Sequence, residues 1–258
     1  MADRDDDISE LLNSWPYDPN DYIREVVGRD GQPKIQVRFP MGIEQYELDG
    51  RPDGLRPFGF STYLDYYVHL RDQAQAAGQG ESFRLAAHDC DLLRDEAMIH
   101  YYRYELLYQR KDYERVIRDT AKNLSAFDLI AGCAESREDT ESMEIYRPFA
   151  MRLHFASRAL LSLRRRKYDE ALRQAQSGVE RLKQLPLIED PKWRRERRSA
   201  LVMLRRLRRH IGRSRPLSQR QRLQLELNRA VAREDYEVAA ELRDRLASLP
   251  AEDEKRPS

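Results

Sequence analysis

Metal-capable side chains gather at one place in this sequence, His88-Asp89-Cys90-Asp91. On a helix, His88 and Asp91 share a face because they are three residues apart, whereas Cys90 points elsewhere. A zinc site needs three or four converging ligands, and no second ligand pair accompanies this cluster. We therefore predict a solvated helix face here, with no metal and no other cofactor.

Residues for acid–base or nucleophilic catalysis are not grouped in the sequence. His69, His100, His154 and His210 each lack a sequence-level partner that would make them a general base. A phosphate loop of the form GxxxxGK[ST] is also missing, which excludes a helicase that uses one. The sequence predicts a protein that is not an enzyme.

Arginine dominates residues 192–222, which hold thirteen positive side chains and one negative, a local charge of +12. The whole chain carries only +1, so the remainder carries −11. Because guanidinium forks bind phosphate well, seven of these arginines are candidate phosphate-binding residues: Arg194, Arg195, Arg198, Arg205, Arg206, Arg208 and Arg209. The arginines either contact nucleic-acid phosphates or pair with acidic protein surface, in this chain or in a neighbour.

A second candidate for anion binding is the segment Gly50-Arg-Pro-Asp-Gly54. Two glycines around Arg51 and Asp53 permit a tight exposed loop that presents a guanidinium to a carboxylate or phosphate. The alternative is a plain turn in which Arg51 pairs with Asp53 or Asp49.

Composition places the chain among helix-rich proteins with large solvated faces. The 258 residues are 40% hydrophobic and 35% charged, and the two cysteines fit a reducing compartment. No apolar run is long enough to span a bilayer, and the acidic start MADRDDDISE is unlike a signal peptide. We predict a cytoplasmic protein without membrane contact.

Residues 1–80 are predicted to form a small α+β region after a loose tail of about ten residues. A short helix is expected from Asp18-Pro19 to Gly28. Alternating apolar residues over 34–39 and 43–48 predict one β-hairpin. A helix capped by Ser61 should then run to about Gly78.

Residues 81–212 are predicted to be helical hairpins. A helix over 81–110 turns at 111–114 into a partner, and a second pair turns at 166–170, before an arginine-rich helix at 193–211. The two turns, KDYERV and RKYDEA, resemble the middle of tetratricopeptide (TPR) repeats. Tyr113 and Tyr168 are 55 residues apart, longer than the ~34-residue standard period, so we expect lengthened, irregular hairpins.

The C-terminal module, residues 217–249, follows a break at Pro216 and contains LQLELNRAVAREDYEVAAELRDRL over 223–246. Apolar residues three and four apart predict two amphipathic helices around a polar turn at 234–237, with Tyr236 filling the corner. A hairpin of this size buries too little apolar surface to be stable alone. Its apolar seam must therefore meet the rest of the chain, another copy or a partner.

This segment resembles the UVR motif, which is shared by subunits B and C of the bacterial excinuclease, some Clp-family ATPases and the activator of bacterial protein arginine kinase. The order of elements is similar to that of bacterial UVR-motif-containing proteins. The resemblance implies docking onto another protein. The kinase activator's paired Cys-x-x-Cys zinc sites are missing here. The residues that we expect to bind a partner are Leu223, Leu227, Ala230, Val231, Tyr236, Ala239, Ala240, Leu242, Arg243 and Asp244.

The sequence thus predicts a mainly α protein with TPR-like helical hairpins, a small N-terminal α+β region containing one β-hairpin and a C-terminal UVR hairpin. The predicted function is a non-enzymatic adaptor that docks through the UVR hairpin onto a similar hairpin, in another protein or in a second copy. The alternative is a nucleic-acid-associated accessory factor, linked to excision repair, that binds phosphates through residues 192–222.

Overall fold

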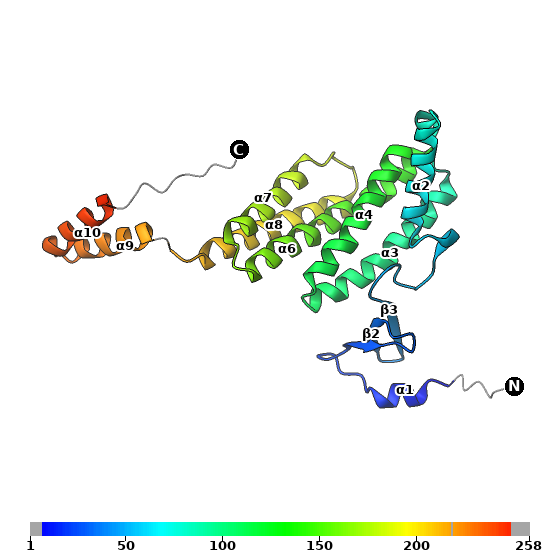
Figure 1. The fold of residues 1–258 in the computed structure, drawn as a ribbon, viewed down its shortest axis with the longest axis horizontal. Helices are drawn as coiled ribbons and strands as arrows, with labels where there is room; N and C mark the ends of the chain where they lie inside the picture. Colours follow the sequence, from blue (N-terminus) through cyan, green and yellow to red (C-terminus); the bar gives the residue numbers. More distant parts are fainter. Residues whose placement is uncertain (1–6, 218, 249–258) are drawn as a thin grey trace. The chain divides into compact units, whose positions relative to one another are not determined.

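The computed structural model describes residues 7–217 and 219–248. It divides the chain into two compact units, residues 1–211 and residues 212–258. Helices dominate both units, and the single sheet belongs to the first (Figure 1). The boundary between the units falls near the end of helix α8 (Pro191–Ser214).

The sheet has three antiparallel strands in the order β1 (Ile23–Val27), β2 (Pro33–Phe39) and β3 (Gly42–Glu47). The predicted hairpin over 34–39 and 43–48 is confirmed as β2 and β3. The helix predicted from Asp18 to Gly28 is wrong, because this stretch contains β1, which pairs with β2 from Ile23↔Val37 to Val27↔Pro33. Its β-branched residues Ile23, Val26 and Val27 suit a pleated strand.

The sheet packs on the helices through one apolar cluster. Ile23, Ile35 and Leu48 meet Tyr104 and Leu107 of helix α3 (Ala87–Gln109). Ile35, Leu48 and Leu107 are fully shielded from solvent. The N-terminal region is therefore joined to the helices by a continuous core.

Two N-terminal details differ from the prediction. Residues 1–6 of the expected loose tail lie outside the described residues, and α1 (Ser9–Ser14) is helical. Helix α2 (Tyr63–Ala76) is capped by Thr62 rather than Ser61, because the Thr62 hydroxyl accepts from the backbone N–H of Asp65.

Helix α3 begins at Ala87, later than the predicted residue 81. A 3-10 turn, η2 (Gly80–Ser82), precedes it, and Leu85 forms an isolated parallel bridge with Ala134. Leu85 is fully buried. It therefore fits the apolar pattern of the helix although it packs in the core before the helix begins. A second 3-10 turn, η1 (Pro57–Gly59), follows the sheet.

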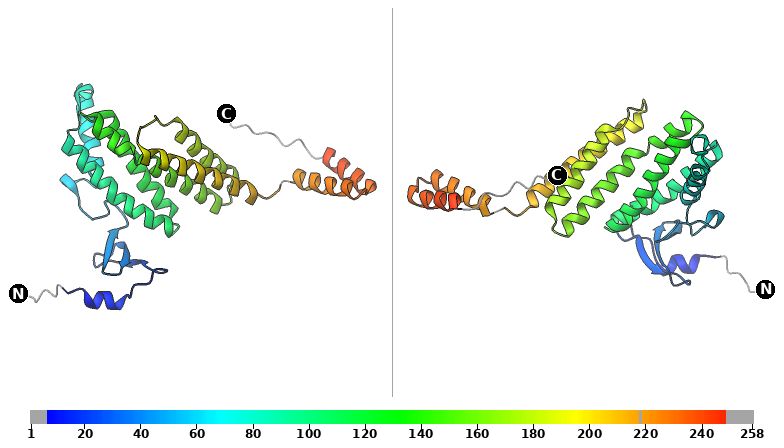
Figure 2. Two further views of the ribbon diagram at one scale, coloured as in Figure 1. Left: turned by 180° about the vertical axis from the view of Figure 1, so that it is seen from behind. Right: turned by 45° about the horizontal axis from the view of Figure 1, so that its top comes forward.

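The helices of the first unit pack in sequence as α3, α4 (Tyr113–Cys133), α6 (Arg147–Arg164) and α7 (Tyr168–Gln184) (Figures 1 and 2). The predicted helix pairs around residues 111–114 and 166–170 are confirmed. A short helix that the sequence did not predict, α5 (Arg137–Glu144), lies between them in the chain. The second unit contains α9 (Gln219–Ala232) and α10 (Tyr236–Ser248).

Helix α8 covers α6 and α7 through Ala200 and Leu204. Close approach here depends on Gly178 of α7. A Cβ at that position would lie 2.6 Å from Cβ of Phe155 and 2.7 Å from Cδ1 of Leu204, too close for either neighbour. The smallest residue thus fixes the spacing of three helices.

The turns of the three helix pairs share one backbone geometry, with a non-glycine residue in the left-handed region: Lys111 (φ 61°), Arg166 (φ 59°) and Glu234 (φ 60°). In each, the next residue's N–H donates to the carbonyl five residues back, the bond of a Schellman helix stop. These bonds join Asp112 to Leu107 (2.9 Å), Lys167 to Ser162 (2.9 Å) and Asp235 to Ala230 (3.0 Å). The likeness of the three turn sequences therefore reflects a shared helix stop.

Glycine at the left-handed position should stabilise the turn. We expect Lys111→Gly to raise the free energy of unfolding by roughly 0.5–2 kcal/mol, because glycine adopts positive φ without a Cβ penalty. Urea unfolding followed by circular dichroism measures this. The neighbouring Arg110 has φ −76°, so Arg110→Gly should be destabilising. An equal decrease in the free energy of unfolding in both variants would contradict the strain assigned to Lys111.

Candidate functional site

The C-terminal hairpin has an apolar core of its own. Leu223 and Ala230 of α9 meet Ala239, Leu242 and Leu246 of α10, and all five are at least nine-tenths buried. Leu227 packs against this cluster while remaining half-buried. Positions three, four and seven apart place each set on one stripe of its helix, so the two stripes face each other.

Four of the ten residues predicted to bind a partner are therefore inside the hairpin. The side chains of Leu223, Ala230, Ala239 and Leu242 pack between α9 and α10. Their apolar pattern is explained by the hairpin's own core. That they contact a partner stays a prediction.

Tyr236 does not fill the corner of the hairpin, as the sequence suggested. Its side chain is 69% exposed at the start of α10. The corner is closed by backbone bonds instead, and the Asp235 carboxylate accepts from the N–H of Val238 (3.3 Å). A large aromatic ring thus stands in solvent beside the turn.

One side of the hairpin carries apolar side chains that are exposed or only half-buried. Val231 follows the buried Ala230 and is 50% exposed, while Ala240 follows the buried Ala239 and is exposed. Because α9 and α10 run in opposite directions, residues one position after each stripe lie on the same side of the pair. Leu227 lies four residues before Val231 and Tyr236 four before Ala240. These four residues form the exposed hairpin face: Leu227, Val231, Tyr236 and Ala240.

Other residues of the hairpin lie away from this face. Leu225 (43% exposed) and Val238 (42% exposed) are apolar, but their helical positions place them on different sides. Arg243 and Asp244, predicted to pair with a partner, are exposed and bond each other at 3.0 Å. Both charges are solvated, so this pair contributes little to stability and is free to exchange partners.

Comparison with known protein families decides what this hairpin is. Residues 218–251 match the family described as the UvrB/uvrC motif. The C-terminal hairpin is a UVR motif. This motif is a helical hairpin that mediates protein–protein interactions. No curated protein and no solved structure matches the chain. The resemblance to TPR repeats in residues 81–212 stays a prediction.

The candidate phosphate-binding arginines all lie on α8. Every one of the seven side chains is exposed. Arg208 bonds the side chain of Gln176 on α7, whereas the other six point away from the helices that α8 covers. The structure thus brings these arginines together on one helix of the first unit.

Arg51 is placed differently from the predicted exposed loop. Its side chain is only 10% exposed and donates to Asp53 (2.9 and 3.0 Å) and to the buried Glu96 (3.3 Å), with its guanidinium 4.8 Å from the Tyr63 ring. This arrangement agrees with the alternative considered from the sequence, a plain turn in which Arg51 pairs with Asp53. Glu96 also accepts the backbone N–H groups of Tyr63 and Leu64, which anchors the start of α2.

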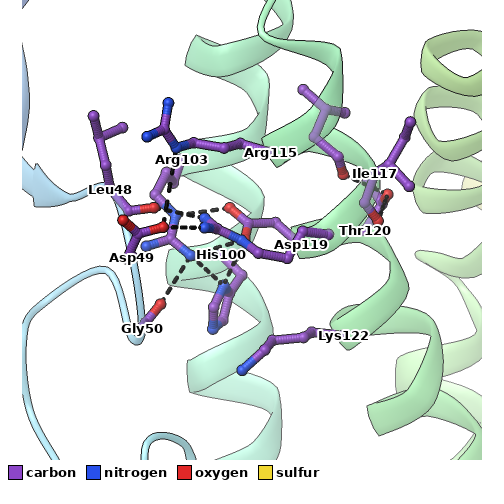
Figure 3. A network of polar contacts seen from close by, with 12 residues as sticks. Leu48, Asp49, Gly50, His100, Arg103, Arg115, Ile117, Asp119, Thr120 and Lys122 are labelled. Atoms are coloured by element: carbon purple, nitrogen blue, oxygen red, sulfur yellow. Dashed lines mark hydrogen bonds and ion pairs between the residues drawn. The ribbon is translucent and has the colours of Figure 1, made fainter. Parts of the chain in front are cut away.

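A buried polar network that the sequence did not reveal holds the same segment (Figure 3). Arg103 of α3 forms two hydrogen bonds with Asp119 of α4, at 2.7 and 2.8 Å, and both side chains are fully buried. The guanidinium also donates to the backbone carbonyls of Glu47 (2.7 Å) and Gly50 (2.9 Å). Burial lowers the pKa of Arg103 and the Asp119 charge opposes this, so the guanidinium stays protonated. The network is a structural clamp between α3, α4 and the end of β3.

Three tyrosines of α3 line a hollow of about 510 Å³ near α6 and the start of α8. Tyr104 is buried, Tyr101 is half-buried and Tyr102 is 48% exposed. Lys192 lies 4.4 Å from the centre of the Tyr146 ring at the same hollow, and Glu196 lies beside it. The hollow is apolar with mixed charges at its rim.

Groups for metal chemistry do not converge in residues 7–217 and 219–248, where no three His, Cys, Asp or Glu side chains are placed to hold an ion. His88 is exposed, and burial raises the pKa of the Cys90 thiol to about 11, which keeps it protonated. No helix of this part of the chain is long and apolar enough to cross a membrane.

Proposed function

We propose that this protein is a non-enzymatic adaptor that docks onto another helical hairpin through the exposed hairpin face of its UVR motif. The observation that carries the proposal is the position of Val231 and Tyr236: both are large, apolar for most of their area and exposed, beside a core that is already complete. Exposed apolar side chains that share one face favour association.

The shape of this face suits a helical partner. Leu227 and Val231, like Tyr236 and Ala240, are four residues apart and form two ridges along antiparallel helices. Ala240 is small, so a partner helix can approach closely between them. Arg243 and Asp244 at the rim would then set orientation by exchanging their mutual pair for charges on the partner.

The partner is another protein with a UVR-type hairpin or a second copy of this chain. A face of four side chains is small, so the helical unit of residues 1–211 would offer a further surface to other proteins. We infer no catalytic step: the described side chains hold no converging metal ligands, and the hydroxyl of Thr120 that lies 3.0 Å from Nδ1 of His154 also bonds the backbone carbonyl of Val116 within its own helix.

The test is a pair of double variants of the full chain. Val231→Asp with Tyr236→Asp places two charges on the exposed hairpin face, and we expect affinity for the partner to fall about 100-fold or more, the cost of two hot-spot residues. The matched control, Leu225→Asp with Val238→Asp, places the same charges on other sides of the hairpin. It should bind like the unaltered protein.

Two measurements read out this test. Sedimentation velocity of the purified proteins detects self-association, and affinity purification from nuclease-treated host lysate, followed by mass spectrometry, detects other partners. Partners lost only in the first variant, and carrying a UVR-type hairpin, support the proposal. Loss in both variants, or in neither, would overturn it. Leu242→Asp is unsuitable, because it charges the hairpin core and unfolds the site.

A further inference from the structure

Helix α8 is divided lengthwise into a buried stripe and an arginine face. Trp193, Ala200, Leu204 and Ile211 are fully or almost fully buried, and their spacings of seven, four and seven place them on one side. The opposite side carries six exposed arginines, which repeat at intervals of three, four, seven and eleven residues. They form the α8 arginine face: Arg194, Arg195, Arg198, Arg205, Arg206 and Arg209.

These six side chains have no structural task in their own unit. Two other arginines of α8 do: Arg197 donates to the carbonyls of Leu182 (2.8 Å) and Lys183 (3.0 Å), and Arg208 bonds Gln176. Elsewhere in the described chain, arginines such as Arg103 and Arg147 pair with carboxylates. Within the described residues, no carboxylate lies at ion-pair distance from any member of the α8 arginine face.

The charge on this face is therefore unneutralised and dense. Its members run from Arg194 to Arg209, which is fifteen steps along the helix or about 22 Å at 1.5 Å per residue. The acid of α8, Glu196, is half-buried and lines the tyrosine-lined hollow. The interpretation that the arginines pair with acidic surface of their own unit does not hold for these six.

We propose that the α8 arginine face binds the sugar–phosphate backbone of a double-stranded nucleic acid. One strand of a duplex presents a phosphate about every 3.4 Å along its axis, so about 22 Å of helix can lie beside roughly six phosphates. Arginine forks donate two parallel hydrogen bonds to each phosphate. A row of six positive charges is more complementary to a polyanion than to a typical protein surface, which carries charges of both signs.

The same face is poorly suited to a membrane. An amphipathic helix binds a bilayer by inserting its apolar side, and that side of α8 is buried against α6 and α7. Val202, 42% exposed, adds little apolar area among the arginines. Trp193 is buried and cannot stack on bases, so binding should not depend on base sequence.

The test measures the salt dependence of binding by the full chain. Fluorescence anisotropy with a labelled 20-base-pair mixed-sequence DNA duplex gives the dissociation constant at several sodium chloride concentrations. Counterion release predicts a slope of log affinity against log salt of about −4 to −5, or roughly 0.9 per phosphate contact. Arg198→Gln with Arg205→Gln and Arg209→Gln should make the slope shallower by about 2.7 and weaken binding more than about 30-fold at 0.1 M salt.

The matched control removes the same charge elsewhere, with Arg29→Gln, Arg137→Gln and Arg173→Gln, three exposed arginines outside α8. Its slope should equal that of the unaltered protein. All six substitutions are on the surface, so unfolding curves should agree within about 0.5 kcal/mol and exclude a folding defect. Equal weakening by both triple variants would overturn the proposal, because it would reflect net charge alone.

Binding measurements with other ligands distinguish which kind of polyanion the α8 arginine face binds. A DNA duplex and an RNA duplex of one sequence show which backbone is preferred, and binding to either supports the proposal. Polyglutamate or vesicles of anionic lipid that bind when both duplexes fail would overturn it in favour of an acidic protein or a membrane. Val231→Asp with Tyr236→Asp should leave the salt slope unchanged, so failure here is separable from failure of the adaptor function.

Discussion

Replacing Asp119 with asparagine is expected to lower the free energy of unfolding by about 3–5 kcal/mol. The substitution preserves shape but removes the charge that balances the Arg103 guanidinium, which is fully buried. A guanidinium cannot release its proton to escape this position. Its bonds to the carbonyls of Glu47 and Gly50 remain, but they do not neutralise it.

Asp128→Asn is the matched control for this substitution. Asp128 also lies on α4 and also bonds an arginine, Arg147 at 2.7 Å, but its side chain is 72% exposed. Solvent screening limits that pair to about 1 kcal/mol or less. Urea unfolding at pH 7 compares the two variants. Similar losses would show that Arg103 and Asp119 are not the main clamp between the helices and the N-terminal region.

The clamp explains why the N-terminal region was hard to assign from the sequence. Arg103 and Asp119 are sixteen residues apart, and each falls in a helix among many other charged residues. Their significance comes from burial and from two backbone carbonyls over fifty residues away. Neither the burial nor these carbonyl contacts can be recognised from local residue spacing. The sequence therefore pointed to Arg51 and Asp53 as candidate binding residues instead.

Local periodicity explains the parts of the fold that the sequence predicted well. The α6–α7 pair and the β2–β3 hairpin carry long amphipathic patterns or strict alternation, which hold in any tertiary context. The failure at β1 has a specific cause. Pro19 and Gly28 bracket a segment that suits a short helix, yet pairing of Ile23 with Val37 made a strand. Tertiary pairing outweighs weak local preference in so short a segment.

For the UVR hairpin, periodicity identified the apolar positions but not their partners. Leu242 and Ala239 repeat correctly whether they face the other helix of the hairpin or another protein. Only the packed structure separates them from Val231 and Tyr236, which are exposed. The left-handed residue Glu234 was also hidden, since non-glycine residues seldom occupy that region and the sequence gives no sign of it.

Acidification from pH 7 to pH 5 should lower the free energy of unfolding by about 2 kcal/mol through His154 alone. Burial, together with the charge of Arg158, lowers the pKa of His154 to about 4 in the folded protein. Its ring packs between α6 and α4, with Nδ1 3.0 Å from the hydroxyl oxygen of Thr120. The unfolded chain binds this proton near pH 6.5, so unfolding takes up a proton between about pH 6.5 and pH 4.

Stability contributed by the neutral His154 ring is therefore complete above about pH 6.5 and is lost as pH falls toward 4. His100 acts in the same direction, because burial and the adjacent Arg103 charge hold its pKa well below 6.5. The measurement is urea unfolding at pH 7 and pH 5. His154→Gln should show a loss smaller by about 2 kcal/mol, since glutamine keeps a polar group near Thr120 without a titrating proton. His88→Gln, a change at an exposed position, should retain the full loss, and an unchanged loss in His154→Gln would mean that this ring is not held neutral in the folded protein.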